Sequence, residues 1–366
     1  MPVKPLPQNP SLTHLKYQAK DLLKEHEARE PRAAQRIREF HPQFGGATDA
    51  DIFRARMSLS DAQLTIAREH GFPSWPRLKR HIENPTLADR LDLPHHERIE
   101  DPTFRRAVEF LDAGDAAGLR AHLQQYPNLA HEHVLFEGGN YFRNPTLLEF
   151  AAENPVRHGK LPENIVEVAK AIVDAGVEQT SLNETLGLVS TGMVPRQCRV
   201  QIALIELLCG HGADPDRALH AAALHGEFEA VEALLKCGGK IDLPIAAALG
   251  QTDQSHRLIS GADQKQRHLA LTLAAMFGHL EIIRMLLEAG EDQDRYNPIS
   301  AHSHSTPLHQ AALAGHANVV QLFVERGARL DIKDTLWQGT PADWARHGGK
   351  TEVERYLREA ERGRTV

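Results

Sequence analysis

Cysteine is scarce in this chain, and its few residues do not form the pairs on which small cross-linked or zinc-bound folds depend. There are three, Cys198, Cys209 and Cys237, an odd number without metal-type spacing. Disulfide frameworks use even numbers of cysteines, and structural zinc sites use closely spaced pairs. We therefore expect free thiols that pack on or beside helices, in a protein of the cytoplasm.

Long apolar runs are also missing. No stretch of about 18 apolar residues occurs, so we expect no membrane span, and the start of the sequence has no apolar signal core. The net charge of −7 argues against a nucleic-acid partner. The chain has no P-loop, dinucleotide fingerprint, nucleophile elbow or Ser-His-Asp order. The sequence therefore indicates no cofactor, and it leaves open whether any reaction is catalysed.

A repeated pattern is present near the C-terminus. Its first copy reads T-P-L-H-Q-A-A-L-A-G-H over 306–316, and its second copy begins at Thr340. The matched glycines Gly315 and Gly349 lie 34 residues apart (349 − 315), a period typical of repeat proteins. Each copy predicts a helix with a threonine cap, a proline in its first turn and a glycine at its end, followed by a second apolar helix. Such pairs cannot bury their apolar sides alone, so they must stack.

This pattern resembles the ankyrin repeat, whose Thr-Pro-Leu-His-x-Ala signature is present from Thr306 to Ala311. Weaker copies precede it, and the matched glycines stand at positions 226, 250, 278, 315 and 349. The resemblance implies an all-α, ankyrin-like helical solenoid over residues 102–362. It also implies binding, most often of a protein, through the concave face and the loops between repeats.

A small helical region is predicted before the solenoid, over residues 11–84, with a linker at 85–101. Helix-starting residues mark its helices: Ser11 caps the first, Pro31 begins the second and Asp61 caps a later one. Four aromatic residues are expected in its core: Phe40, Phe44, Phe53 and Trp75.

Part of this region, Ser60–Leu64 with Ala67–Phe72, resembles a segment that precedes ankyrin repeats in some bacterial proteins. The resemblance implies a bacterial source and this order of domains. It implies no activity.

Three insertions interrupt the repeats, at His131–Pro145, Arg295–Ser305 and Asp334–Gly339. Loops at the rim of a solenoid commonly carry its binding residues, and exposed Tyr, Trp and Arg are enriched at binding hot spots. Alternatively, the aromatic residues fold back and pack their own loops. The side chains predicted to bind are Tyr141, Arg143, Asn144, Tyr296, Asn297, His302, His304, His309, Trp337 and Gln338.

One pair among these residues has a possible second role. Alternate residues of an extended strand point the same way, so His302 and His304 could bind one metal ion, with His309 as a third ligand. A polar hairpin without metal is the alternative. The sequence thus supports two functions. One is recognition of a protein partner. The other is binding of a small molecule or metal, with possible acid–base chemistry, in a pocket lined by the insertions.

The histidine position of the repeat signature is occupied in turn by Glu149, His220, Thr272, His309 and Asp343. We expect these side chains to hydrogen bond between repeats. The alternative is a row of titratable groups that act as general acids and bases.

Overall fold

The computed structural model describes residues 4–7, 10–83, 90, 93–136, 141–299 and 301–364. These residues form helices and turns without a strand, and an isolated antiparallel bridge joins His133 to Thr146. The predicted all-α fold is confirmed. None of the described helices is both long and apolar enough to cross a membrane.

The chain divides into two compact units. The first combines Met1–Ile82 with Ile241–Val366, and the second is Glu83–Lys240. The division therefore falls inside the predicted solenoid, and it groups the N-terminal helices with the C-terminal repeats. Residues 85–89, 91 and 92 of the predicted linker at 85–101 lie outside the described residues.

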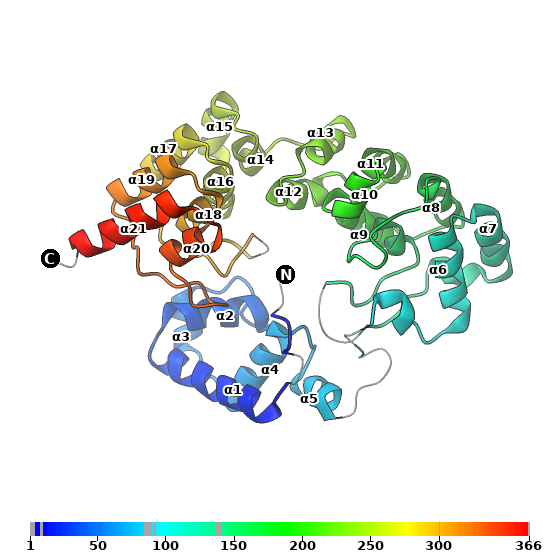
Figure 1. Cartoon of the computed structure of the whole chain (residues 1–366), viewed down its shortest axis with the longest axis horizontal. Coiled ribbons are helices and arrows are strands. Elements are labelled where there is room, and N and C mark those ends of the chain that lie inside the picture. The colour runs from blue at the N-terminus through cyan, green and yellow to red at the C-terminus, as the bar shows by residue number, and fades with distance from the viewer. Residues whose placement is uncertain are drawn as a thin grey trace. The chain divides into compact units, whose positions relative to one another are not determined.

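Five helices make up the N-terminal part of the first unit (Figure 1): α1 (Leu12–Glu27), α2 (Pro31–Phe40), α3 (Asp49–Arg54), α4 (Leu59–Glu69) and α5 (Trp75–Glu83). Ser11 caps α1 and Pro31 begins α2, as predicted. The prediction that Asp61 caps α4 is wrong. Ser58 is the cap, and Asp61 stands three residues inside the helix, where its carboxylate accepts the backbone N–H of Ser58 at 2.8 Å. The two residues form a reciprocal capping box.

The core of this N-terminal part is mainly aliphatic, with one aromatic residue that the sequence did not single out. Phe72 is fully buried, as are Leu22, Ile37, Ile66 and Leu78. Of the four aromatic residues predicted for this core, Phe40 is buried. The other three pack against its edge and are only partly buried: Phe44, Phe53 and Trp75.

The C-terminal part of the first unit consists of four helix pairs. They are α14 (Leu243–Ala248) with α15 (Thr252–Leu258) and the 3-10 turn η5 (Ile259–Gly261), α16 (Gln264–Phe277) with α17 (Leu280–Glu288), α18 (Pro307–Ala314) with α19 (Ala317–Glu325), and α20 (Pro341–His347) with α21 (Thr351–Arg364). The first helices pack in a row, α14 to α16 to α18 to α20, and the second helices form a parallel row. The predicted stacking of helix pairs is confirmed here.

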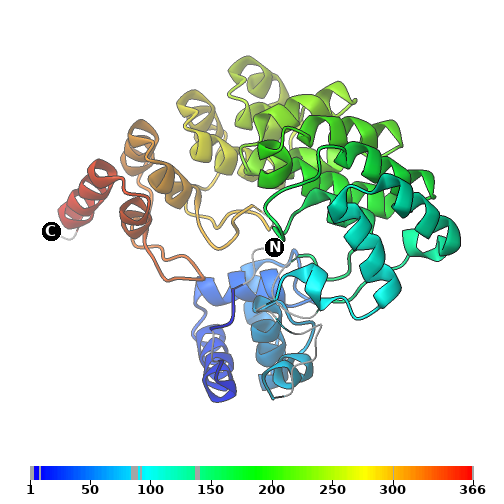
Figure 2. The same cartoon turned by 45° about the vertical axis from the view of Figure 1, so that its right-hand side comes forward.

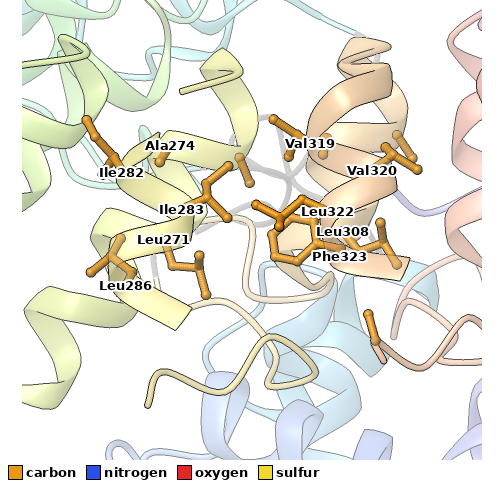
Figure 3. Close-up of a cluster of buried hydrophobic side chains, with 14 of the residues drawn as sticks. Leu271, Ala274, Ile282, Ile283, Leu286, Leu308, Val319, Val320, Leu322 and Phe323 are labelled. Atoms are coloured by element: carbon orange, nitrogen blue, oxygen red, sulfur yellow. The ribbon is translucent and has the colours of Figure 1, made fainter. Parts of the chain in front are cut away.

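The apolar sides of neighbouring pairs meet in one core (Figure 3). Leu271 and Ile283 from the α16–α17 pair lie close to Leu308 and Phe323 from the α18–α19 pair. All four are at most 1% exposed. Burying such a side chain stabilises the fold by about 1.5–3 kcal/mol, and side chains of the neighbouring pair belong to the same buried cluster. This dependence on neighbours is the physical reason for the repeat.

Glycines at the ends of the first helices are required for two reasons. Gly278 has φ +80, where residues with a Cβ are strained. In addition, a Cβ placed there would lie 2.7 Å from Nδ1 of His316, which belongs to the next pair. His316 donates from Nε2 to the carbonyl of Met276 at 2.8 Å and so ties the pairs together. All five matched glycines have positive φ: Gly226, Gly250, Gly278, Gly315 and Gly349.

The second unit is also built from helices, and Figure 2 shows several of its green helix pairs side by side. The described helices of this unit are η2 (His95–Arg98), α6 (Pro102–Ala113), α7 (Ala116–Gln125), η3 (Pro127–Ala130), η4 (Leu148–Ala152), α8 (Ile165–Asp174), α9 (Gln179–Ser190), α10 (Met193–Gln197), α11 (Gln201–Gly210), α12 (Asp216–Leu224) and α13 (Phe228–Lys236). The repeat helix predicted from Thr146 is the short 3-10 helix η4, which is followed by Glu153 with φ +46.

The segment after η4 is held by a buried ion cluster. The Arg157 side chain is 1% exposed and pairs with Asp112 at 2.7 Å and with Glu153 at 3.0 Å. Glu153 also accepts the backbone N–H groups of Arg157 and Gly159. The insertion after residue 153 is therefore held to α6 and to the end of η4 through Arg157.

Candidate functional site

Two of the three predicted insertions belong to the first unit, and they are joined to each other. We call Arg295–Ser305 and Asp334–Gly339 the paired loops. The backbone N–H of Thr335 donates to the carbonyl of His304 at 2.9 Å. The Tyr296 hydroxyl donates to the carbonyl of Lys333, beside the second loop, at 2.7 Å. Figure 2 shows both loops leaving the helix stack on the same side, before α18 and α20.

A single buried carboxylate organises the second of these loops. Asp334 is fully buried and accepts hydrogen bonds from four N–H groups. Its oxygens receive the backbone N–H groups of Leu336 at 2.9 Å, Trp337 at 2.6 Å and Gly339 at 2.7 Å, and the indole N–H of Trp344 at 3.0 Å. These four hydrogen bonds tie the backbone of the loop and the ring of Trp344 to one side chain.

The same loop displays an aromatic side chain. Trp337 is 66% exposed, the largest value among the exposed large hydrophobic residues that the structure describes. Its ring stands edge-on to His304 at 5.1 Å between centroids, and 6.2 Å from the ring of Trp344. Side chains on a rigid support lose little conformational entropy on binding. Trp337 is therefore an exposed aromatic side chain on a loop whose backbone is held by Asp334, which suits a binding anchor.

Two predicted binding residues in these loops are part of the fold itself. Asn297 is 1% exposed, accepts a hydrogen bond from Thr272 at 3.0 Å and donates to Ser305 at 3.2 Å. Tyr296 is half-buried, and burial raises the pKa of its hydroxyl to about 12. Asn297 holds the loop against the preceding repeat, and Tyr296 joins it to the chain beside the second paired loop. Asn297 is therefore not available on the surface.

The histidines of the proposed metal set do not have the expected geometry. His302 has φ +56, and its carbonyl accepts the N–H of Ser305 in a turn, so the assumed extended strand is wrong. The rings of His302 and His304 are T-shaped at 6.0 Å. Both ring nitrogens of His309 are used: Nδ1 bonds Thr306 and Nε2 donates to the carbonyl of Gly339. Among the described residues, no group of three or more His, Cys, Asp or Glu could hold a metal ion.

Burial explains the protonation of these histidines. His304 is 3% exposed, and burial together with the neighbouring His302 lowers its pKa to about 4. His309 is fully buried, and burial lowers its pKa to about 4 as well. Both rings are neutral at pH 7. His309 thus serves as a hydrogen-bonding element between repeats, as expected for this position of the signature.

Of the other positions of the signature, Thr272 makes a bond beyond its own helix pair, whereas Glu149 and Asp343 bond within their own repeat. Thr272 donates to Asn297, which lies in the loop before the next repeat. Glu149 accepts the backbone N–H of Thr146 at 2.9 Å, and burial raises its pKa to about 7. Asp343 accepts the backbone N–H of Thr340 at 2.9 Å. These bonds are local or reach the next repeat, and they favour packing over acid–base chemistry.

The remaining insertion, His131–Pro145, belongs to the second unit, and residues 137–140 are outside the described part. Its arms are linked by the N–H of Phe136 donating to the carbonyl of Arg143 at 2.7 Å. Phe136 and Phe142 are buried and pack against Phe150, the fold-back alternative considered from the sequence.

The other predicted residues of this insertion are closer to solvent. Tyr141 is 53% exposed, and its hydroxyl donates to Asn154. Asn144 is exposed, and its carbonyl accepts from Nδ1 of His133 at 2.7 Å. Arg143 is half-buried.

A cavity of about 350 Å³ is present in the second unit. It is lined by His96, Glu97, Arg105, Val108, Glu109 and Asp112. None of the predicted binding residues lines it. This cavity is therefore not the pocket that was predicted from the insertions.

Sequence reasoning missed two features of the site. The first is Asp334, whose only sequence signal was its position before a Trp-containing loop that ends in glycine. The second is α2, which covers part of the paired loops: Gln35 donates to the carbonyl of Ser303 at 2.6 Å, and Arg32 donates to Gln338. No local pattern links residues 268 positions apart.

The stacked helix pairs of the first unit, with capped first helices and glycine stops, define a helical repeat protein whose paired loops connect successive pairs. The chain belongs to the ankyrin-repeat family. The family model described as ankyrin repeats (3 copies) matches residues 243–334.

Curated relatives agree with this assignment. The chain is 31% identical over 125 residues to cyclin-dependent kinase 4 inhibitor B of Bos taurus, which covers 33% of this chain and 92% of that protein. It is 29% identical over 160 residues to human cyclin-dependent kinase inhibitor 2A, covering 43% and 87%. It is 30% identical over 95 residues to ankyrin repeat and SAM domain-containing protein 6 of Mus musculus, covering 26% and 10%.

Proposed function

We propose that this chain is a binding module that recognises a protein partner through the paired loops. The main support for this proposal is the exposure of Trp337, which is 66% exposed on a loop held by the buried Asp334. Ankyrin repeats are generally protein–protein interaction modules, and an exposed tryptophan is the residue type most enriched at binding hot spots.

The surface around Trp337 adds polar specificity. Gln338 is exposed with φ +62, and His302 is half-buried in the adjoining loop. An apolar ring surrounded by an amide and an imidazole suits a partner with an apolar pocket and hydrogen-bonding groups at its rim. Tyr141 and Asn144, which are exposed in the second unit, extend the proposal to a second contact point.

The experiment is recovery of a stoichiometric partner from the source cell by the tagged chain, compared between the wild type, Trp337→Ala and Tyr17→Ala. Tyr17 is also a large exposed aromatic residue, at 60%, on α1. Loss of a hot-spot side chain costs about 2 kcal/mol or more, or roughly 30-fold in affinity. We expect Trp337→Ala to lose the partner and Tyr17→Ala to keep it. Equal recovery by all three proteins would show that Trp337 does not contribute to binding, and it would refute this proposal.

Three further expectations stay predictions. A cytoplasmic location is supported by three cysteines that are all free. A bacterial source rests on the N-terminal resemblance alone. The alternative is metal or small-molecule binding by the paired loops. His309 does not support it as a third metal ligand, since both of its ring nitrogens are hydrogen-bonded, to Thr306 and to Gly339.

A further inference from the structure

The tip of the first paired loop is buried, although loops of a solenoid normally meet solvent. Ala301, Ser303, His304 and Ser305 are each at most 3% exposed. Helix α2 of the same unit lies against this tip, since Gln35 donates from Nε2 to the carbonyl of Ser303 at 2.6 Å. The loop surface at which a partner is expected to bind is thus covered by a helix of the same chain.

The face of α2 that meets the paired loops is polar and regularly spaced. Arg32 donates to the side-chain oxygen of Gln338, and Gln35 donates to Ser303. Glu39 is 5% exposed and lies beside the Ser303 side chain. The three positions i, i+3 and i+7 share one side of a helix. The other side of α2 packs into the N-terminal core through Ala33, Ala34 and Ile37.

The fit between α2 and the paired loops is incomplete. Among the described residues, the buried atoms of α2 and the paired loops that have no hydrogen-bond partner include Oε2 of Glu39, Oγ of Ser303, Nδ1 of His304 and Oγ1 of Thr335. Leaving buried polar atoms unpaired costs free energy that a better-matched partner recovers. A helix with a donor at the position of Glu39 would therefore bind these loops more tightly than α2 does.

We propose that α2 is an in-chain occupant of the paired loops, and that the external partner binds there by presenting a polar helix that displaces it. The partner's helix carries a guanidinium, an amide three residues later and a hydrogen-bond donor seven residues later, on one face. This inference rests on the proposed function, because it names the class of partner for the same loops. Trp337 is exposed at the edge while α2 is bound, so the partner contacts it first and then replaces α2.

The first test weakens the contact in the full chain. Gln35→Glu places a carboxylate against the carbonyl of Ser303, while it keeps the acceptor that Arg38 bonds at 2.6 Å. We expect amide hydrogen exchange over 301–306 to become at least tenfold faster. The matched control is Gln124→Glu, the same change at an exposed position of α7, which should leave this exchange unchanged. Unchanged exchange in Gln35→Glu would overturn the inference.

The second test asks what the uncovered loops bind. The probe is a fluorescent peptide, held helical by a lactam staple, with Arg, Gln and Gln at the spacing of Arg32, Gln35 and Glu39, and with alanine at its other positions. We expect at least tenfold tighter binding to the Gln35→Glu chain than to the wild type, and a loss of that gain on adding Gln338→Ala. Equal binding to the wild type and Gln35→Glu, or no binding to either, would overturn the inference.

A milder variant keeps the tests decisive if Gln35→Glu unfolds. Arg32→Ala removes the contact with Gln338 at the exposed edge and should change both readouts in the same direction, by less. Circular dichroism melting curves establish folding for each variant. These tests use no natural partner, so they can fail while Trp337→Ala still abolishes partner recovery. Conversely, partner recovery can survive Trp337→Ala while α2 is shown to be displaceable.

Discussion

Glu39→Gln should stabilise the protein at alkaline pH, because it replaces a carboxyl group whose ionised form is destabilised by burial. Glu39 is 5% exposed, and burial, together with the nearby Glu69, raises its pKa from 4.5 to about 7. The folded protein therefore holds this proton more tightly than the unfolded chain. The associated stability is fully present below pH 4.5 and is lost as the pH rises through about 7.

The magnitude follows from the size of the shift. One pKa unit corresponds to about 1.4 kcal/mol, so the rise from 4.5 to about 7 corresponds to roughly 3 kcal/mol. At pH 8 the wild type carries almost this whole cost, whereas the neutral amide of Gln carries none. At pH 5 the cost is below about 1 kcal/mol, since the carboxyl is protonated in the folded state.

The assay is urea-induced unfolding of the wild type and Glu39→Gln at pH 5 and pH 8, followed by far-UV circular dichroism. We expect the variant to gain about 3 kcal/mol at pH 8 and less than about 1 kcal/mol at pH 5. Glu359→Gln, the same change at an exposed position of α21, serves as the control and should have little effect at either pH. A variant that is equally destabilised at both values would show that the charge of Glu39 is well paired, and the reasoning would be refuted.

Three other predictions concern the repeats and their loops. Gly278→Ala should cost more stability than Gly290→Ala, because both glycines have positive φ (+80 and +84) but only at Gly278 would the new Cβ meet a neighbour, 2.7 Å from His316. We expect about 1 kcal/mol for Gly290→Ala and at least about 2 kcal/mol for Gly278→Ala, and equal melting temperatures would contradict this. Asp334→Asn loses the charge and one of two acceptor oxygens that together bond four N–H groups, so hydrogen exchange over 335–339 should accelerate at least tenfold while exchange in α16 stays constant. Added zinc should leave the melting temperature of the untagged protein unchanged, since His309 is occupied, and a rise that His302→Ala abolishes would restore the metal site.

Local sequence patterns predicted the repeated part of this fold because its causes are local. A threonine cap, a proline in the first turn and a glycine stop act within one helix, and all five matched glycines do have positive φ. The apolar spacing fixed which side of each helix is buried. Even where a detail was wrong, as with Asp61, the error was a shift of three residues within the same capping box.

The sequence by itself therefore determined the helix pairs, their need to stack and the positions of the long loops. Only the tertiary structure decided which loop residues face solvent. Trp337 is exposed, whereas His304 and Asn297 are buried, because Asp334, the preceding repeat and α2 supply the surroundings. These contacts join residues up to 306 positions apart, as between Arg32 and Gln338. Burial of a side chain is a property of everything packed around it, so a pattern read within one segment cannot contain it.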